Sequence, residues 1–233
     1  MSVSARLEAI GRLIPANSRV ADVGTDHAYL PVWLIERKIS PFVIATDLHA
    51  GPLEAAKGSA KRAGIERGIS FRLADGLEAV SPHEIDTVVI AGMGGETISG
   101  ILRRTPWLTE GAYRLILQPQ SKIPQLMDDL AEQGFRVLDQ HLVKDGGRIY
   151  PIYEAEPGYM EAAAGGGRYI HPALLERGDP LLGAYLTTLC QKLNRALGGL
   201  ERAGEDMAEK RVEFALALTD LEGWNAHVYQ KSL

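Results

Sequence analysis

Two carboxylates and a histidine surround one glycine early in the chain, in the segment VADVGTDHAYLP over residues 20–31. An apolar run ends there, and Gly24 permits a tight turn and the close approach of a ligand to the backbone. A turn that binds phosphate presents bare N–H groups, whereas this one carries Asp22 and Asp26, followed by His27. The pattern therefore disfavours an anionic pyrophosphate and favours a cationic ligand with hydroxyl groups, such as S-adenosylmethionine.

A second acidic residue, Asp47, follows the next apolar run, FVIAT over residues 42–46. Such a run is typical of a buried strand. In nucleotide-binding sheets, an acidic residue about twenty positions after the glycine turn binds ribose hydroxyls, because one carboxylate can accept from two of them. The alternative is an N-cap for a helix expected over residues 52–63, but the intervening residues favour the ligand role.

Two further expected strands end in residues suited to ligand contact. The strand at residues 69–73 precedes Asp75 and Gly76, which either face an adenine ring or form an ordinary turn. The strand at residues 87–90 leads into AGMGG, whose glycines indicate close approach to backbone and whose Met93 would wall a ring. Because the carboxyl ends of parallel strands hold the ligand in open α/β sheets, these segments predict one shared site.

Strand and helix patterns continue to alternate up to about residue 160. A strand is expected at residues 114–118 and a helix at 122–133. The strands expected at 135–143 and 148–155 have only a turn between them, which predicts an antiparallel pair at the end of the sheet. This order predicts an α/β fold: a three-layer sandwich around a seven-stranded, mostly parallel sheet.

The remainder of the chain has a different character. Residues 156–180 are polar and glycine-rich, and the triple glycine at 165–167 predicts a flexible loop. From Leu181 onward, leucines recur at helical spacing, and a second helix is expected over about residues 205–221. Such a hairpin is too small for an independent core. The expected domains are residues 1–160, and then a linker with a coiled-coil-like helical domain over residues 161–233.

Composition narrows the classes of protein further. No run of eighteen apolar residues and no signal-peptide core is present, so a cytoplasmic protein without a membrane span is expected. A single cysteine, Cys190, excludes an internal disulfide. No metal site is predicted, because none of the six histidines pairs with a ligand at helical spacing. No obligate protein partner is evident from the sequence.

The net charge of −5 argues against a broadly basic surface but leaves room for a local basic face. Most cations are expected to lie on an ordinary solvated surface. The candidates for such a face in the main body are Arg6, Arg12, Arg103, Arg104, Arg114, Lys122 and Lys144.

The chain resembles the bacterial tRNA (adenine-N1)-methyltransferase family that modifies adenine 22 in the D-arm, often called the TrmK family. The resemblance covers nearly the whole chain. It rests on ADVGTDHAYLP (21–31), Asp47 with Gly51 and Pro52, AGMGG (91–95), LILQPQ (115–120) and GRIYPI (147–152). It implies a Rossmann-like class I methyltransferase domain with a helical tail, S-adenosylmethionine as cofactor and the D-arm of tRNA as partner.

The resemblance also implies roles for individual residues. Asp26 is expected to be the acidic group that stabilises charge developing on adenine, with His27 and Tyr29 as base-contacting candidates. An equal alternative for His27 is a structural hydrogen bond that orients the turn. Donor contacts are expected from Asp22, Gly24, Thr25, Asp26, His27, Ala28, Asp47, Leu48, Gly51, Pro52, Asp75, Gly76, Ala91, Gly92 and Met93. Substrate contacts are expected from Tyr29, Gly94, Gly95, Gln118, Pro119 and Gln120.

Three alternative functions stay open at this point. A methyltransferase of the same fold could act on a small molecule or a protein, which the acidic composition favours and the helical tail disfavours. A nicotinamide-dependent oxidoreductase would carry G-x-G-x-x-G after the first strand, where this chain has DVGTDH. A non-catalytic module would bind S-adenosylmethionine or tRNA without turnover.

Overall fold

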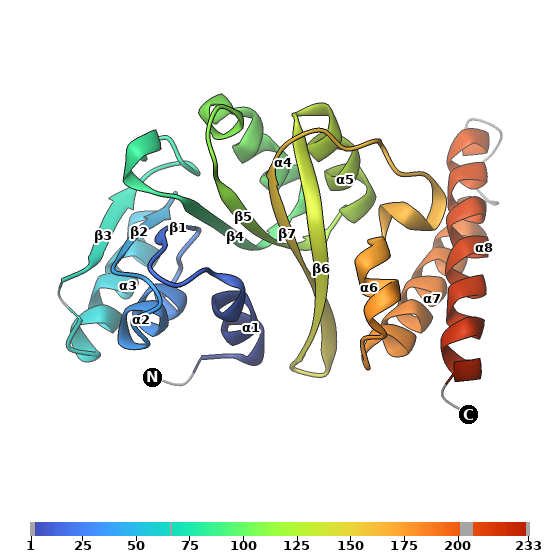
Figure 1. The fold of residues 1–233 in the computed structure, drawn as a ribbon, viewed down its shortest axis with the longest axis horizontal. Coiled ribbons are helices and arrows are strands. Elements are labelled where there is room, and N and C mark those ends of the chain that lie inside the picture. Colours follow the sequence, from blue (N-terminus) through green and yellow to red (C-terminus); the bar gives the residue numbers. More distant parts are fainter. Residues whose placement is uncertain (1–2, 66, 201–206, 232–233) are drawn as a thin grey trace. The chain divides into compact units, whose positions relative to one another are not determined.

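The computed structural model describes residues 3–65, 67–200 and 207–231. The chain divides into two compact units, Met1–Met160 and Glu161–Leu233. All seven strands belong to the first unit, and the second unit is helical (Figure 1). Among the described helices, none combines the length and the apolar character needed to cross a membrane.

A single twisted sheet of seven strands forms the centre of the first unit (Figure 1). The strand order is β3-β2-β1-β4-β5-β7-β6, and β7 runs antiparallel to both of its neighbours while the remaining pairs are parallel. The strands are β1 (Arg19–Val23), β2 (Phe42–Asp47), β3 (Ile69–Leu73), β4 (Thr87–Gly94), β5 (Arg114–Ser121), β6 (Phe135–Asp145) and β7 (Arg148–Pro157). The predicted fold is thereby confirmed, including the antiparallel pair at one end.

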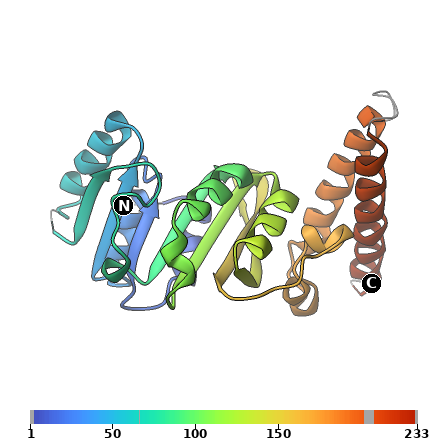
Figure 2. The ribbon, with the colours of Figure 1, turned by 90° about the horizontal axis from the view of Figure 1, so that it is seen from above.

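Helices cover both faces of this sheet (Figure 2). Alternate strand residues enter two separate hydrophobic clusters, because successive side chains of a strand point to opposite faces. Val89 and Ile116 join the cluster of α1 and α2, whereas Val88 and Leu115 join that of α4 and α5. The helices of this unit are α1 (Ala5–Leu13), α2 (Tyr29–Glu36), α3 (Ala50–Arg62), α4 (Gly95–Arg103) and α5 (Ile123–Glu132), with short 3-10 turns at Pro82–Glu84 and Pro106–Thr109.

Burial explains why β1, β2 and β4 read as continuous apolar runs. A parallel strand with helices on both faces must be apolar on both sides, and four of the five residues of β1 are buried. The same burial extends through β2 up to Asp47. These strands therefore carry their polar residues only at the carboxyl end, where the sheet meets solvent.

Several expected boundaries shift in the structure. Helix α3 begins at Ala50, with His49 as its N-cap, so Gly51 and Pro52 lie inside its first turn rather than in a separating loop. Strand β4 continues through AGMG, and α4 then begins at Gly95, three residues before the expected start. The β6–β7 turn is limited to Gly146 and Gly147, both in the left-handed region.

The second unit differs more from expectation. Gly165–Arg168 forms a 3-10 turn, and both Gly165 and Gly166 are buried, so the prediction of a flexible loop is wrong. The Gly166 N–H donates to Asp220 Oδ2 at 2.8 Å, which fixes this turn against the last helix. The helices are α6 (Pro172–Arg177), α7 (Leu182–Leu200) and α8 (Ala208–Lys231). The expected start of the last helix at residues 205–206 lies outside the described residues, and its end is ten residues later than predicted.

Candidate functional site

Hydrogen bonds join the loops that follow β1, β2 and β3 at the carboxyl edge of the sheet. The N–H groups of Gly24 and Thr25 donate to the Thr46 carbonyl at 2.9 and 3.0 Å. The Thr46 hydroxyl in turn donates to the Gly76 carbonyl at 2.8 Å. Segments that lie far apart in the sequence, from Gly24 to Gly76, thus form one continuous wall, as the parallel arrangement of strands predicts.

A cavity of about 620 Å³ opens beside this wall. We refer to it as the donor cavity, after the methyl donor S-adenosylmethionine that the sequence leads us to expect there. It brings together residues from α1 and the segment before it, β1, the β1–α2 loop, α2, β4 and β5. The lining residues are Val3, Ser4, Arg6, Leu7, Asp22, Gly24, Thr25, Asp26, Tyr29, Leu30, Ala91, Gly92 and Gln120. The cavity therefore joins predicted residues of the first glycine turn to the predicted AGMGG and QPQ segments.

Asp22 is the buried acidic group of the donor cavity, with 6% of its surface exposed. The Thr25 hydroxyl donates to its Oδ2 at 2.7 Å. Burial raises the pKa of Asp22 to about 6, against the opposing effect of the Thr25 hydrogen bond, and the charge of Asp47 raises it further. A cation in this cavity would favour the ionised form of Asp22, so the site is suited to a positively charged ligand.

Asp47 ends β2 and is occupied on both oxygens by backbone donors. Its Oδ2 accepts from the Asp26 N–H at 3.3 Å, and its Oδ1 accepts from the His49 N–H at 2.9 Å. Asp47 therefore ties the glycine turn to the start of α3. Each carboxylate oxygen keeps a second lone pair, which leaves acceptor capacity for ligand hydroxyl groups.

An exposed aromatic pair stands next to the donor cavity. The rings of His27 and Tyr29 stack with centroids 5.4 Å apart and planes 28° from parallel. His27 Nε2 lies 3.6 Å from Asp26 Oδ1, and the Asp26 side chain is 71% exposed. Asp26 and Ala28 both have positive φ, at 50° and 55°. Such non-glycine conformations cost about 1–2 kcal/mol each, and they often mark functional turns.

Gln118 lies on β5 beside Ala91 of the AGMGG segment and is completely buried. Its Oε1 accepts from Arg6 Nη1 at 2.5 Å and from the Gly92 N–H at 3.2 Å, while its Nε2 donates to the Pro119 carbonyl at 3.0 Å. With these contacts, Gln118 fixes the position of Gly92 from the neighbouring strand. Gly92 itself has φ of 78°, which favours a residue without a side chain.

Sequence reasoning missed the contribution of α1 to the site. It named Arg6 only as one of several surface cations, yet Arg6 lines the donor cavity together with Leu7. A signal was present, because Arg6 precedes Ile10 and Leu13 by four and seven residues and so falls on the apolar stripe of its helix. A cation at such a position needs a specific polar partner, which here is Gln118.

The other predicted site residues lie outside the cavity lining, in distinct surroundings. Asp75 forms an ion pair with Arg104 at 2.8 Å. The Met93 side chain lies against Gly24, at the point where a Cβ on that glycine would clash with it. A Cβ on Gly95 would come within 2.5 Å of the Lys122 carbonyl, so this glycine serves close backbone packing. The remaining predicted residues that do not line the cavity are His27, Ala28, Leu48, Gly51, Pro52, Gly76, Gly94 and Pro119.

Comparisons with known proteins bear directly on this arrangement. Residues 3–153 match the family described as "Methyltransferase domain". A Bacillus subtilis protein described as tRNA (adenine(22)-N(1))-methyltransferase is 34% identical over 166 residues, covering 71% of this chain and 70% of the relative. The chain belongs to the tRNA (adenine(22)-N1)-methyltransferase family. The resemblance inferred from the sequence motifs is thereby confirmed.

Solved structures agree with this family assignment over almost the whole chain. The Bacillus subtilis m1A22 tRNA methyltransferase TrmK has a TM-score of 0.83 at 28% identity, covering 96% of this chain and 99% of that one. A Streptococcus pneumoniae relative solved in complex with S-adenosyl-L-methionine has the same TM-score at 28% identity, covering 96% of this chain and all of the other. The likeness therefore extends beyond residue 153 into the second unit.

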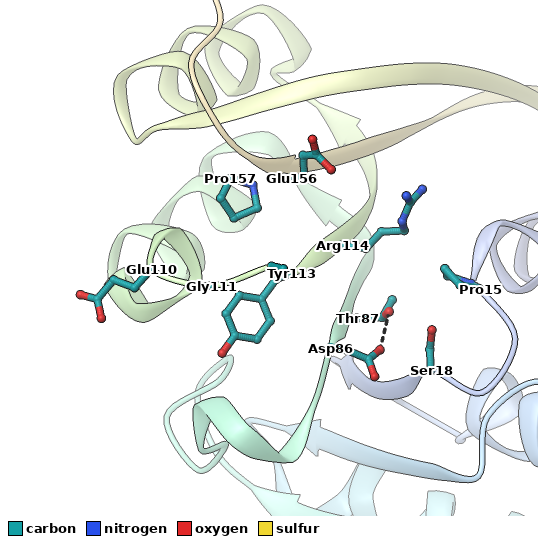
Figure 3. A pocket seen from close by; sticks show the side chains of 11 residues that line it. Pro15, Ser18, Asp86, Thr87, Glu110, Gly111, Tyr113, Arg114, Glu156 and Pro157 are labelled. Carbon is teal, nitrogen blue, oxygen red and sulfur yellow. Dashed lines mark hydrogen bonds between the residues drawn. The ribbon is translucent and has the colours of Figure 1, made fainter.

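A larger cavity of about 730 Å³ lies at the opposite, amino edge of the sheet (Figure 3). Tyr113 and Arg114 line it together with Asp86 and Glu156, and the Thr87 hydroxyl donates to Asp86 at 2.9 Å. None of the motif segments that identify the methyltransferase family contributes to its lining. Its size alone therefore does not make it the functional site.

One further polar cluster lies on β6 and β7, where Asp139, His141 and Glu154 place ligand atoms within 4.8 Å of one another. His141 Nε2 is 2.7 Å from Glu154 Oε1, and Arg114 donates to Glu154 Oε2 at 2.5 Å. The His141 hydrogen bond, followed by that of Arg114, holds the pKa of Glu154 below its ordinary value despite burial. The methyltransferase site does not include this cluster, which serves as an ion-pair network within the sheet.

Proposed function

We propose that this protein transfers a methyl group from S-adenosylmethionine to N1 of adenine 22 in the D-arm of tRNA. The observation that carries the proposal is the donor cavity itself. It places the buried Asp22 carboxylate, Gly24 and Tyr29 at the carboxyl edge of a class I methyltransferase sheet, and the His27 ring stacks on Tyr29. Membership of the tRNA (adenine(22)-N1)-methyltransferase family supports the same substrate and product.

The residues at the carboxyl edge fit S-adenosylmethionine by their chemistry. Asp22 offers a buried negative charge for the ammonium group of S-adenosylmethionine. Burial is the largest cause of its raised pKa. Asp47 keeps free lone pairs for the two ribose hydroxyls. Gly24 leaves the turn open beside Met93, whose side chain would provide an apolar wall. When bound, S-adenosylmethionine supplies an electrophilic methyl group on a sulfonium.

The acceptor side of the site is assigned to His27, Tyr29 and Asp26. Adenine N1 lies on the Watson–Crick edge, so the base must be unpaired or flipped out before it can enter. The stacked rings of His27 and Tyr29 offer an exposed flat surface for such a base. Methylation places positive charge on the ring, and the Asp26 carboxylate would stabilise that charge. Catalysis then depends largely on holding N1 in line with the methyl group.

The remaining predicted residues are assigned to positioning and to the edges of the site. Asp75 and Gly76 follow β3, and we assign them to the adenine end of the donor together with Leu48. Gln118 positions Gly92 and Arg6, and Gln120 of the same QPQ segment lines the cavity directly. Gly51 and Pro52 begin α3 beside Asp47, where they shape the ribose end.

The deciding experiment is methyl transfer from labelled S-adenosylmethionine to unmodified tRNA, followed by nucleoside mass spectrometry. We expect 1-methyladenosine from the wild type and little or none from Asp26→Ala. Glu110→Gln removes an exposed carboxylate at the amino edge and should leave the reaction unchanged. Donor binding without any methylated nucleoside would contradict the proposed acceptor.

The position of the methyl group is tested separately. A tRNA transcript that carries guanosine in place of adenine 22 should not be methylated, whereas substitution of another D-arm adenine should have little effect. Methylation of both transcripts to the same extent would show that the enzyme acts elsewhere on tRNA. Neither outcome would change the conclusion about S-adenosylmethionine binding, because the two transcripts differ only in the acceptor.

A further inference from the structure

Eight of the seventeen basic side chains described in the first unit form an ion pair with a carboxylate. Five of the seven main-body candidates form ion pairs, which are Arg12–Glu8 at 2.7 Å, Arg103–Asp129 at 3.8 Å, Arg104–Asp75 at 2.8 Å, Arg114–Glu154 at 2.5 Å and Lys122–Glu96 at 3.6 Å. Among the residues that the structure describes, no ion pair involves Arg6 or Lys144, and the same holds for Arg148. Of these three, Arg6 already donates to Gln118, which leaves Lys144 and Arg148 as the candidates for binding an external anion.

Lys144 and Arg148 flank the turn of the β6–β7 hairpin. Both side chains are exposed. A Cβ added at Gly146 or Gly147 would meet no atom within 4 Å, so the turn projects into open space. The hairpin end is therefore accessible to a large ligand from several sides.

This hairpin end lies on the same edge of the sheet as the donor cavity. Strand β6 follows β5 in direction, because β7 is antiparallel to both. The turn that ends β6 thus falls at the carboxyl edge, together with the ends of β1 and β4. Arg67, just before β3, lies at the opposite edge and is equally exposed.

Tyr150 connects the hairpin to the cavity. The Arg6 guanidinium, which lines the donor cavity, lies 5.5 Å from the centre of the Tyr150 ring. Arg148 precedes Tyr150 by two residues and so shares its face of the strand, roughly 7 Å further toward the turn. A surface therefore runs from the cavity wall, over Tyr150, to Arg148, while Lys144 pairs with Ile149 and lies on the other face of the hairpin end.

Electrostatics limits what these cations could bind. The proposed donor is cationic and the methylated adenine gains positive charge, so additional cations near the reaction would not stabilise it. An RNA strand presents one phosphate per nucleotide, and lysine and arginine neutralise such phosphates with release of counterions. A protein of net charge −5 would need such contacts concentrated in one place.

We propose that the end of the β6–β7 hairpin, with Lys144 and Arg148, binds the phosphate backbone of the RNA strand that carries the target adenine. This inference rests on the proposed function, since it assumes that tRNA is the acceptor. The hairpin then acts as a guide that holds the strand while the base enters beside Tyr29. Its contacts position the backbone and carry no information about base sequence.

The test compares charge changes at the two edges of the sheet. Lys144→Glu and Arg148→Glu should each raise the KM for tRNA about tenfold, with kcat and donor Kd within about twofold of wild type. Asp145→Asn removes the only carboxylate of the turn and should lower the KM. Arg67→Glu makes the same charge change at the amino edge and should leave the KM unchanged. Binding measured between 50 and 200 mM salt should show a slope smaller by about one for Arg148→Glu.

The outcomes separate this inference from the proposed function. A wild-type protein that neither binds nor methylates tRNA would overturn both. Normal methylation with an unaltered KM in Lys144→Glu and Arg148→Glu would overturn the hairpin contact alone. Equal losses in Arg67→Glu and Arg148→Glu would also overturn it, because the effect would then reflect net charge. An unchanged donor Kd in Lys144→Glu and Arg148→Glu excludes misfolding of these variants as an explanation.

Discussion

Asp22 is the buried residue through which we propose that ligand binding is controlled in this protein. It lies in the donor cavity with only Thr25 as a side-chain hydrogen-bond donor in the described contacts, and its pKa is raised to about 6 by burial. Near neutral pH the carboxylate is therefore ionised but poorly solvated. A cationic ligand would replace the missing solvation, so binding and ionisation are coupled.

We expect the affinity for S-adenosylmethionine to rise with pH until Asp22 is ionised. Below a pH of about 6, protonation removes the negative charge, and the donor affinity should fall about tenfold for each further pH unit. Above that pH the affinity should level off. Isothermal titration between pH 5 and 7.5 would measure this dependence.

Asp22→Asn provides the control, because it keeps an acceptor for the Thr25 hydroxyl without an ionisable group. The variant should bind the donor weakly and with little pH dependence over the same range. A wild-type profile that stays flat from pH 5 to 7.5 would contradict the role of Asp22. So would an Asn variant that retains the full pH dependence.

At the residue scale, the sequence predicted the site residues that lie close to one another along the chain. Asp22, Gly24 and Asp26 are close in sequence, and their association with one turn follows from that alone. The Arg6–Gln118 hydrogen bond joins residues 112 positions apart. Such a pair depends on how α1 packs across the sheet, which no local pattern specifies.

Among the elements, the β6–β7 pair carries an ion-pair network that responds to acid. Glu154 has a lowered pKa because of its hydrogen bonds from His141 and Arg114. A carboxyl group with a lowered folded pKa stabilises the protein above its unfolded pKa, and the contribution is lost as the pH falls through the folded value. Glu154→Gln should therefore lower stability by about 1.5 kcal/mol at pH 7.

The predicted effect of Glu154→Gln has a distinctive pH dependence. The difference in unfolding free energy between wild type and variant should shrink below pH 4.5 and vanish once Glu154 is protonated in the folded state. Urea denaturation at several pH values would measure it. A difference that stays constant from pH 7 to pH 3 would show that lost packing, rather than charge, is responsible.

The 3-10 turn at Gly165–Arg168 packs against α8 and predicts a sharp difference between two glycines. A Cβ on Gly166 would lie 2.7 Å from Asp220 Cβ and 2.8 Å from the Trp224 ring. Gly166→Ala should therefore destabilise the second unit by about 1–3 kcal/mol. Limited proteolysis of residues 161–233 would report this loss, while donor affinity in the first unit stays unchanged.

Gly223 on α8 is the matched control for Gly166. A Cβ there would meet no atom within 4 Å, and glycine in a helix is less favourable than alanine by about 0.5–1 kcal/mol. Gly223→Ala should therefore make the second unit more resistant to proteolysis. Equal effects of the two substitutions would mean that the turn does not pack closely on α8.

At the element scale, the sequence predicted every strand but placed several helix boundaries incorrectly. The apolar runs of β1, β2 and β4 stand out because burial on both faces leaves no polar positions within them. The triple glycine at 165–167 has no such signature, and its burial depends on Trp224 and Asp220 far along the chain. The absence of side chains at these glycines was interpreted as flexibility. In the structure, the same absence allows the turn to pack closely on α8.

At the scale of the whole molecule, the residues of the proposed donor site all belong to the first unit. Every residue that lines the donor cavity lies between Val3 and Gln120. The second unit carries exposed cations at Lys192 and Arg195 on α7 and at Lys210 on α8. A molecule as large as tRNA can contact such a surface in addition to the cavity, and basic side chains contribute affinity through phosphate contacts.

Removal of residues 161–233 should therefore leave the donor Kd within about twofold of the full chain and weaken tRNA binding about tenfold or more. Circular dichroism and donor titration would show that the remaining sheet is folded. Filter binding of tRNA would measure the loss. A folded truncation with undiminished affinity for tRNA would rule out a role of the second unit in binding.

During synthesis on a ribosome, β5 and β6 emerge before β7, although β7 lies between them in the finished sheet. The outer edge of β5 and one edge of β6 must therefore wait for residues 148–157 before they find their partner. Unpaired strand edges are templates for association with other chains. A nascent chain that pauses shortly after Asp145 would expose both edges, which makes this interval the most vulnerable to aggregation.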